Sequence, residues 1–416
     1  MLNPFRALRY AGVDGPDLAR LLSPPYDVVD DDERRELEDT DPYNVIRLIL
    51  PRDEDGEPGS AYRRARRTLA GWRREGVLRA DDAPALYVYE MSDGAGARTR
   101  GLVGTVGLTP PEAEVVLPHE NTMAGPVSDR LALTEATAAN LEPIYLVYPG
   151  GGAASSVVVS AGATPRLVTS TTPDGVTHRL WAVTDPDAVA AVAADLLPRR
   201  ATIADGHHRY ATYLQHQADR HAAGDGPGPW DRGLALLVDA SEYGPQVHAI
   251  HRVVPGLPLA EAVARAAGAF SVADVPPGSA LSALSGADAP AFLLTDGDRW
   301  ALLTSPSAVE LAAALPAERS AAWRGLDVTV AHRLLIDRLW GLRDHEDVVG
   351  FRHDVPAAVA AARASGGTAL LLNPTPVDAV VAVASAGERM PRKSTLFTPK
   401  PRTGLLMRAY ADEQDA

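Results

Sequence analysis

The sequence of 416 residues contains no cysteine. This absence excludes disulfide bonds, zinc–thiolate sites, iron–sulfur clusters and cysteine nucleophiles. Long hydrophobic runs are missing as well. The N-terminal segment MLNPFRALRYAG lacks the apolar core of a signal peptide, and glycines, serines and prolines interrupt the uncharged run between Pro143 and Pro165. We therefore expect no membrane span and a cytoplasmic location.

Positive charge is in deficit. The chain has 40 Lys and Arg against 54 Asp and Glu, a formal net charge of -14. A non-specific nucleic-acid binder needs a basic surface that displaces counterions, so this balance argues against that class. The hydrophobic content of 46% is that of an ordinary globular protein. We expect a small-molecule ligand and no nucleic acid, and the sequence leaves the oligomeric state open.

Strand and helix patterns mix without a strict βαβ rhythm, which predicts an α+β fold with mixed sheets, flanking helices and two to three subdomains that share a central cleft. The flexible PGGGAASS segment suggests a boundary. The expected division is an N-terminal domain over 1–150, a central domain over 151–257, a small α+β insert over 258–330 and a C-terminal segment over 331–416.

Local patterns predict individual elements. ALYVYEM and TRGLVGTVGL are expected to pair as strands, SVVVS to form a short strand, and GLALLVDA to pair with HAIHRVV. DPDAVAAVAADLLP is typical of a capped helix. The segment from Pro258 to Ser307 is expected to run helix, strand, helix, strand, strand. Tyr62 to Arg74 is a strongly basic amphipathic helix, which we interpret as a solvated surface.

The segment ATIADGHHRYATYLQ carries the strongest functional signal. An apolar strand runs into Asp205 and Gly206, and a helix is expected to begin near His207. A helix N-terminus disfavours cations by about 0.3–1 kcal/mol each, yet His207, His208 and Arg209 lie there. Free backbone N–H groups, the helix dipole and these side chains together favour a bound phosphate. A capped or buried helix start is the structural alternative.

A metal is the rival ligand at this segment. Two adjacent histidines on a helix point to different faces and are poor joint ligands. A Mg2+ ion held by Asp205 and by substrate phosphates is the more plausible arrangement.

The loop LPHENTMAGPVSDR is a second candidate. Glu120 is a candidate general base, since titratable residues in a loop flanked by proline and glycine suit a site. HEN lacks the spacing of HExxH, which excludes a zincin. Candidate substrate-binding residues in this segment are His119, Thr122, Asp129 and Arg130. The alternative is a surface loop followed by a helix whose first turn contains Asp129.

MPRKSTLFTPKPRTGL is a concentrated positive segment in an acidic chain, and lysine is a common point-charge partner for phosphate. The alternative is a solvated tail. Its candidate phosphate-binding residues, with Gly206, are Lys393, Ser394, Thr395 and Lys400. Weaker substrate-binding candidates, from SPPYDVV, DPYNVIRL and HAIHRVV, are Tyr26, Asp27, Asn44, Arg47, His251 and Arg252.

These blocks occur in an order that resembles the large bacterial family catalogued as domain of unknown function 1015. The blocks that carry the resemblance are SPPYDVV, DPYNVIRL, PHENT with SDR, IADGHHRYAT, HAIHRVV and MPRKSTLFTPKP. Asn121 stands where the family pattern has a lysine, which weakens a phosphate-binding role for this loop. In addition, DGHHRYAT is similar to the nucleotide-phosphate motif of the ParB/sulfiredoxin-like superfamily, which includes kinases of free serine. His207 occupies the place of the sulfiredoxin cysteine.

The resemblance implies a small-molecule kinase with pyrophosphate, ATP or ADP as donor, Mg2+ as cofactor and free L-serine as acceptor. In this hypothesis Glu120, Asp205 and His207 form the catalytic set. Phosphoryl transfer depends mostly on positioning and charge stabilisation, for which several cations and one carboxylate suffice. Two alternatives use the same anion site: a nucleotide- or phosphometabolite-binding protein without turnover, and a metal-dependent phosphohydrolase.

Overall fold

The computed structural model describes residues 1–53, 57, 59–94, 96–342 and 348–413. Its contacts divide the chain into two units. Unit 1 comprises Met1–Pro118, Thr122–Pro245 and Pro399–Ala416, and unit 2 comprises His119–Asn121 and Gln246–Thr398. Each unit has its own sheet and its own core. Among the described residues, no helix has both the length and the apolar character needed to span a bilayer.

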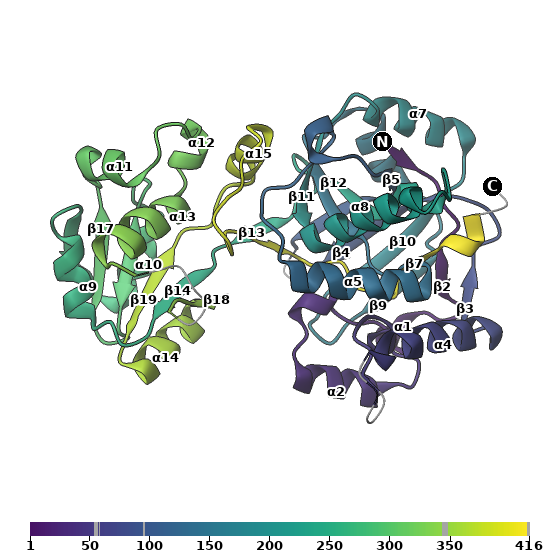
Figure 1. Cartoon of the computed structure of the whole chain (residues 1–416), viewed down its shortest axis with the longest axis horizontal. Coiled ribbons are helices and arrows are strands. Elements are labelled where there is room, and N and C mark those ends of the chain that lie inside the picture. The colour runs from purple at the N-terminus through teal and green to yellow at the C-terminus, as the bar shows by residue number, and fades with distance from the viewer. Residues whose placement is uncertain (54–56, 58, 95, 343–347, 414–416) are drawn as a thin grey trace. The chain divides into compact units, whose positions relative to one another are not determined.

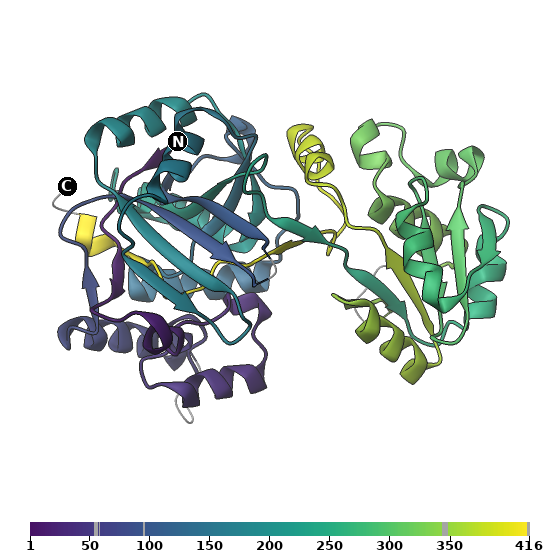
Figure 2. The same cartoon turned by 180° about the vertical axis from the view of Figure 1, so that it is seen from behind.

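Unit 1 is built on a mixed nine-stranded sheet, seen from two sides in Figures 1 and 2. β11 is parallel to β6 and β12 is parallel to β8, whereas the other pairs are antiparallel. The strand order, with β1 paired to β5 off the path, is β6 (Val116–Leu117), β11 (Ala201–Asp205), β8 (Ile144–Tyr148), β12 (Arg232–Asp239), β5 (Arg98–Gly107), β4 (Leu86–Ser92), β10 (Thr177–Val183) and β9 (Val168–Thr171), and β1 is Leu2–Asn3.

Helices α5 and α8 pack against one another on this sheet, and α4 packs against α5. Two short strand pairs complete the unit, β2 (Leu8–Tyr10) with β3 (Leu78–Ala80) and β7 (Ala139–Asn140) with β21 (Arg408–Ala409). The unit 1 helices are α1 (Gly15–Ala19), α2 (Asp31–Thr40), α3 (Ile46–Ile49), α4 (Ser60–Arg74), α5 (Ala124–Thr137), α6 (Gly152–Ala161), α7 (Pro186–Leu196) and α8 (His207–Ala222), with short 3-10 turns at Tyr26–Val28, Pro111–Ala113, Pro229–Asp231 and Tyr410–Glu413.

Unit 2 has a six-stranded sheet in which all pairs are antiparallel. Its order is β15 (Ser271–Asp274), β17 (Trp300–Thr304), β16 (Phe292–Thr295), β19 (Thr368–Leu372), β14 (His251–Val254) and β18 (Gly350–Arg352); β13 (Gln246–His248) pairs with β20 (Leu396–Thr398). The helices are α9 (Leu259–Ala266), α10 (Pro277–Ser285), α11 (Ala308–Ala314), α12 (Ala321–Arg324), α13 (Asp327–Val330), a π-helical turn over Ala331–Leu339, α14 (Val355–Ser365) and α15 (Val377–Ser385).

The predicted α+β class is confirmed by these sheets and helices. Strong local patterns also gave correct elements. β4 pairs with β5 in the expected hairpin, and the segment after Pro258 has the predicted order of helices and strands. The side chain of Asp185 caps α7 by accepting a hydrogen bond from the Asp187 N–H. Caps and alternation are local signals, which is why they could be read from the sequence.

Two local predictions were wrong. SVVVS lies in α6 and not in a strand, since Ala154, Val158 and Ala161 recur at helical spacing and are buried against the sheet. The predicted linker PGGGAASS begins the same helix. Asp195 accepts a hydrogen bond from the Ala154 N–H and Asp239 accepts one from the Gly151 N–H, which satisfies backbone donors at this helix start.

The expected pair between GLALLVDA and HAIHRVV does not form. Both edges of β12 are already occupied, by β5 on one side and β8 on the other, within the buried centre of the unit 1 sheet. The HAIHRVV segment instead supplies β13 and β14, which pair with strands of unit 2. Both segments have strand character, but the pairing partner is decided by tertiary contacts.

Candidate functional site

Asp205 lies at the predicted strand–turn–helix junction of unit 1. It ends β11, Gly206 follows with φ +93°, and α8 begins at His207. A Cβ on Gly206 would lie 3.1 Å from Cζ of Arg209. The turn therefore requires glycine for two reasons, a left-handed backbone and an arginine side chain folded closely beneath it.

Two cations hold the Asp205 carboxylate. Arg209 Nη2 donates to Oδ2, and Lys400 Nζ, from one of only two lysines in the chain, donates to Oδ1. Arg209 also donates to the carbonyl oxygen of Pro143, and its Nε is buried without a hydrogen-bond partner. Burial alone would raise the pKa of Asp205, but the charges of Lys400 and Arg209 outweigh it and lower that pKa below its usual value.

Asp27 is a second carboxylate in the electrostatic field of Asp205. It lies in the 3-10 turn Tyr26–Val28, and the residue as a whole is exposed although the protein around it desolvates the carboxyl group. Desolvation by the surrounding protein and the negative charge of Asp205 raise the pKa of Asp27, while Arg209 and Lys400 oppose that rise. The two aspartates thus have pKa values shifted in opposite directions, an arrangement that assigns separate acid–base roles to two carboxyl groups.

Glu142 is a functional candidate that the sequence reasoning missed. Its carboxylate accepts hydrogen bonds from the Tyr26 N–H (3.1 Å) and the Thr403 hydroxyl (3.0 Å). Burial raises the pKa of Glu142, and the nearby charges of Arg209 and Arg130 oppose that rise. An acidic residue between Leu141 and Pro143, directly before the apolar strand β8, was the available signal for a buried carboxylate.

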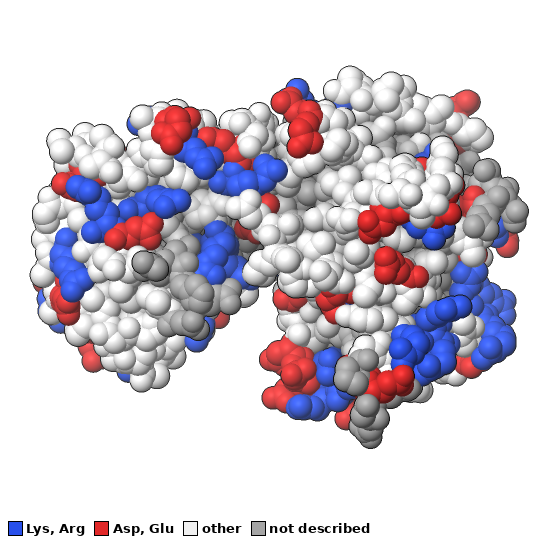
Figure 3. Space-filling model, in the orientation of Figure 1, with Lys and Arg blue, Asp and Glu red and all other residues white. Residues whose placement is uncertain are grey.

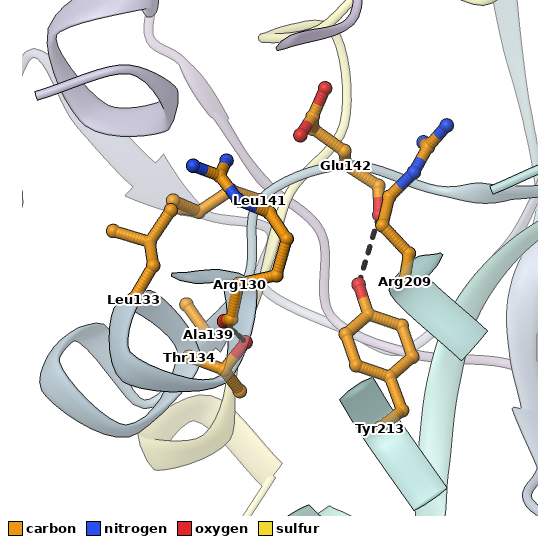
Figure 4. A pocket seen from close by; sticks show the side chains of 8 residues that line it. All are labelled: Arg130, Leu133, Thr134, Ala139, Leu141, Glu142, Arg209 and Tyr213. Atoms are coloured by element: carbon orange, nitrogen blue, oxygen red, sulfur yellow. Dashed lines mark hydrogen bonds between the residues drawn. The ribbon is translucent and has the colours of Figure 1, made fainter. Parts of the chain in front are cut away.

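Glu142, Arg130 and Arg209 surround a cavity of about 20 Å³, shown in Figure 4. The lining is completed by Leu133, Thr134, Ala139, Leu141 and Tyr213. The Tyr213 hydroxyl donates to the Glu142 carbonyl oxygen (3.1 Å). This volume suits about one water molecule and not a substrate. Lys400, whose side chain is 17% exposed, is not among the residues that line this cavity.

The two motif histidines differ in their surroundings. His207 is buried at the first position of α8. Nε2 of His208 accepts a hydrogen bond from the Met123 N–H (3.1 Å), immediately before α5. An accepting Nε2 means that the neutral ring carries its proton on Nδ1.

Other sequence-predicted residues of unit 1 have structural partners. Asn44 is fully buried, donates to the carbonyl oxygens of Arg20 and Leu22, and accepts from the Ile46 N–H. Such a saturated amide fixes the loop and has no exposed group for a substrate. Arg47 donates to the Glu38 carbonyl oxygen.

The SDR segment is likewise held by its neighbours. Arg130 donates to Asp129 and to the Ile49 carbonyl oxygen, and its guanidinium lies 4.2 Å from the Tyr26 ring centroid. Asp129 also accepts a hydrogen bond from the Tyr62 hydroxyl (2.8 Å). Thr122 is exposed just before α5. Arg130 thereby links the SDR segment to Tyr26 beside the Asp205 cluster.

Unit 2 contains a second cluster, in which the HEN and KST segments meet. His119 is fully buried, and its Nε2 lies 3.0 Å from the Thr395 hydroxyl and 3.9 Å from a Glu120 carboxylate oxygen. The His119 carbonyl oxygen accepts from the Met390 N–H, and Phe397 packs near the imidazole. Segments about 276 residues apart in sequence are thus in direct contact.

Arg252 holds the backbone of the KST segment in place through hydrogen bonds. It is 1% exposed and donates to the Lys393 carbonyl oxygen (2.9 Å) and to His332 Nε2 (3.0 Å). Lys393 has φ +53°, a left-handed conformation that costs a non-glycine residue about 1–3 kcal/mol. The Ser394 hydroxyl donates to the Pro391 carbonyl oxygen. Burial and the charge of Arg252 lower the pKa of His251 to about 4.

Asp205, the predicted Mg2+ ligand, is engaged by two protein cations. Each of its oxygens is bound by a cation, Lys400 on one and Arg209 on the other. Within the described ranges there is also no group of three His, Asp or Glu side chains that could hold a metal ion. Each carboxylate oxygen has a second lone pair, so the binding of Mg2+ by Asp205 together with substrate phosphates stays a prediction.

The structure thus brings several predicted residues together within each unit. In unit 1 the clustered residues are Tyr26, Asp27, Arg130, Asp205, Gly206, Arg209 and Lys400, joined by Glu142. In unit 2 they are His119, Glu120, Lys393, Ser394, Thr395, His251 and Arg252. Asn44 and Arg47 contact neither cluster through the hydrogen bonds given above.

A family model described as "Protein of unknown function (DUF1015)" matches residues 2–329. The chain belongs to this family. No curated protein matches it. Among solved structures, this DUF1015 chain is similar to a conserved hypothetical protein from Pyrococcus furiosus, with 14% identity, a TM-score of 0.35 and coverage of 72% of this chain and 91% of the other.

Two further solved structures are similar to this chain, with comparably low sequence identity and TM-score. One is a free serine kinase in complex with AMP, with 14% identity, a TM-score of 0.36 and coverage of 71% of this chain and 87% of the other. The other is SbnI with C-terminal truncation from Staphylococcus aureus, with 11% identity, a TM-score of 0.37 and coverage of 76% and 90%.

Proposed function

We propose that this DUF1015 chain is a small-molecule phosphotransferase that moves a phosphoryl group from pyrophosphate, ATP or ADP to a hydroxyl acceptor. The observation that carries the proposal is the pair of aspartates in unit 1 with opposite pKa shifts, beside Lys400 and Arg209 at the start of α8. One carboxyl group is kept ionised, and the raised pKa of the other makes it the better proton acceptor of the two.

The start of α8 supplies the phosphate-binding part of the proposed site. The first-turn N–H groups have no partners inside the helix, and the helix dipole favours an anion. In the proposal the donor phosphate lies against this turn. Lys400 exchanges part of its contact with Asp205 for a phosphate oxygen, whereas the buried Arg209 keeps Asp205 ionised and in place.

Asp27 is the proposed proton acceptor. The acceptor hydroxyl oxygen attacks the terminal phosphorus of the donor, a new P–O bond forms, and the bond to the leaving phosphate or nucleotide breaks. The hydroxyl proton passes to the Asp27 carboxylate, whose pKa is raised by desolvation and by the charge of Asp205. Glu142 positions Tyr26 by accepting its backbone N–H, and Tyr26 in turn precedes Asp27.

The acceptor proposed is free L-serine, on the strength of the DGHHRYAT resemblance. Glu120 of unit 2 is the other candidate base. The position of Glu120 in a loop flanked by proline and glycine favours it as the general base. The raised pKa of Asp27 and its charged neighbours favour Asp27 for the same role. Separate variants of these two residues distinguish the assignments.

The test is phosphorus NMR of the purified chain with L-serine and, in separate samples, ATP, ADP or pyrophosphate, with and without added Mg2+. We expect a new phosphomonoester signal with one donor. Asp27→Asn should lower kcat by about 10²–10⁴-fold, the usual contribution of a general base. Asp39→Asn, a change at an exposed aspartate of α2, is the matched control and should retain activity.

Each other outcome reassigns the function. Orthophosphate without a phosphomonoester would indicate a phosphohydrolase. Binding of the donor without turnover would indicate a sensor and contradict the enzyme proposal. A loss of activity in Glu120→Gln but not in Asp27→Asn would move the base to the HEN segment and remove Asp27 from the chemistry.

A further inference from the structure

We propose that unit 1 has a second anion site, an arginine pocket on α4 that binds a compact polyphosphate. The pocket has a volume of about 520 Å³, within the range of small-molecule sites. Its charged lining consists of Arg47, Arg52, Arg64, Arg67 and Arg74, with Glu38 and Glu75 as the acids. This inference is independent of the proposed phosphotransfer at Asp205.

The pocket follows from the sequence of α4. Ala65, Leu69 and Trp72 are buried and fix one face of the helix against the unit. Arg64, Thr68, Gly71 and Glu75 recur at helical spacing along the face that lines the pocket. Gly71 adds no side chain there; a Cβ at this position would make only ordinary van der Waals contacts, 3.7 Å from Glu75 Oε1 and 3.9 Å from Arg74 Nη2. The small residues between the long arginines make this surface concave. A helix face that is only solvated needs no such concave surface.

The positive charge of the pocket is compensated in part, and Arg67 is one of the arginines that already have a partner. Glu38 pairs with Arg52 (2.8 Å), and Glu75 accepts a hydrogen bond from the Tyr43 hydroxyl (3.3 Å). Over the described ranges, Arg64 and Arg74 make no ion pair, and Arg47 Nε is buried without a hydrogen-bond partner. Planar guanidinium groups with unused donors match phosphate oxygens best.

The charge around the pocket favours a compact anion over a long one. Figure 3 shows blue Lys and Arg side chains gathered over α4 and red acidic side chains over α2 in the same unit. Glu38 of α2 reaches the pocket itself. A nucleic-acid strand would have to continue past these acids on a chain of net charge -14, whereas a short polyphosphate fits among the arginines.

The probe is inorganic tripolyphosphate, titrated calorimetrically into the full chain at about 0.15 M salt, where exposed charges are screened beyond about 8 Å. We expect Arg64→Ala to weaken binding about tenfold, the loss of one charge-assisted contact, and the double variant Arg64→Ala/Arg74→Ala to weaken it further. Arg66→Ala removes an exposed arginine from the same helix outside the pocket lining and should change the affinity by less than about twofold.

Lys400→Met separates this site from the Asp205 cluster and should leave the Arg64-dependent binding intact. The proposal is overturned if wild-type protein does not bind tripolyphosphate, or if the folded double variant binds it as tightly as wild type. It is equally overturned if Arg66→Ala matches the Arg64→Ala loss, if Lys400→Met alone abolishes binding, or if a single-stranded RNA oligonucleotide binds more tightly than tripolyphosphate. Thermal unfolding checks that the variants fold. We expect them to fold because Arg64 and Arg74 are both exposed.

Discussion

Replacing Arg209 with methionine should destabilise unit 1 by about 3 kcal/mol. Arg209 is 3% exposed, donates to Asp205 and to the Pro143 carbonyl oxygen, and lies under the Gly206 turn. Removing one partner of a buried ion pair costs about 3–5 kcal/mol because the other charge stays buried. We expect the lower end of this range, since Lys400 remains on the Asp205 carboxylate.

A loss of this size is measurable in thermal unfolding. For a domain the size of unit 1, about 1 kcal/mol corresponds to about 2–4 °C, so the melting temperature should fall by roughly 6–12 °C. Arg63→Met is the matched control. Its guanidinium pairs with Glu57 at the surface, where such pairs contribute about 0–1 kcal/mol. Urea unfolding of the same variants gives the free energy of unfolding independently.

A double-mutant cycle isolates the ion pair itself. Asp205→Asn removes the charge that Arg209 compensates, so the double variant Asp205→Asn/Arg209→Met should be more stable than the sum of the single losses by about 1–3 kcal/mol. If Arg209→Met costs less than about 1 kcal/mol, or if the two substitutions are additive, the Asp205 carboxylate does not depend on Arg209 and the reasoning is refuted.

Three further predictions concern single residues. Gly206→Ala should lower the stability of unit 1 by about 1–2 kcal/mol, since φ is +93° and the new Cβ meets Arg209; an unchanged melting temperature would contradict this. Burial and the charge of Arg402 lower the pKa of His178 to about 3, so the unfolded chain takes up this proton first as the pH falls. The contribution of neutral His178 to the free energy of unfolding is therefore fully present above about pH 6.5, and it should fall by up to about 1.4 kcal/mol per pH unit down to about pH 3. Urea unfolding at several pH values should show a smaller slope for His178→Asn than for wild type. Arg252→Met should destabilise unit 2 by at least about 2 kcal/mol, because four donor contacts in a site that is 1% exposed are lost, and a silent substitution in urea unfolding would exclude this role.

The sequence alone determined the elements whose signals are local. The apolar strand, the Asp205–Gly206 turn and the helix from His207 were predicted from adjacent residues and are present as expected. The Asp185 cap and the helix–strand order after Pro258 were predicted in the same way. Caps, turns and side-chain alternation act over a few residues, so their consequences do not depend on the rest of the chain.

Only the tertiary structure decided which of these residues meet. Lys400 reaches Asp205 across 195 positions of sequence, and Glu142 enters the cluster from a segment without a motif. SVVVS became helical since burial against a sheet outweighs the preference of valine for strands. The side chain of Asn44, a predicted substrate-binding residue, donates to two carbonyl oxygens of a distant loop, a contact that no local pattern indicated. Such outcomes depend on packing and charge pairing between distant segments, which local propensity does not encode.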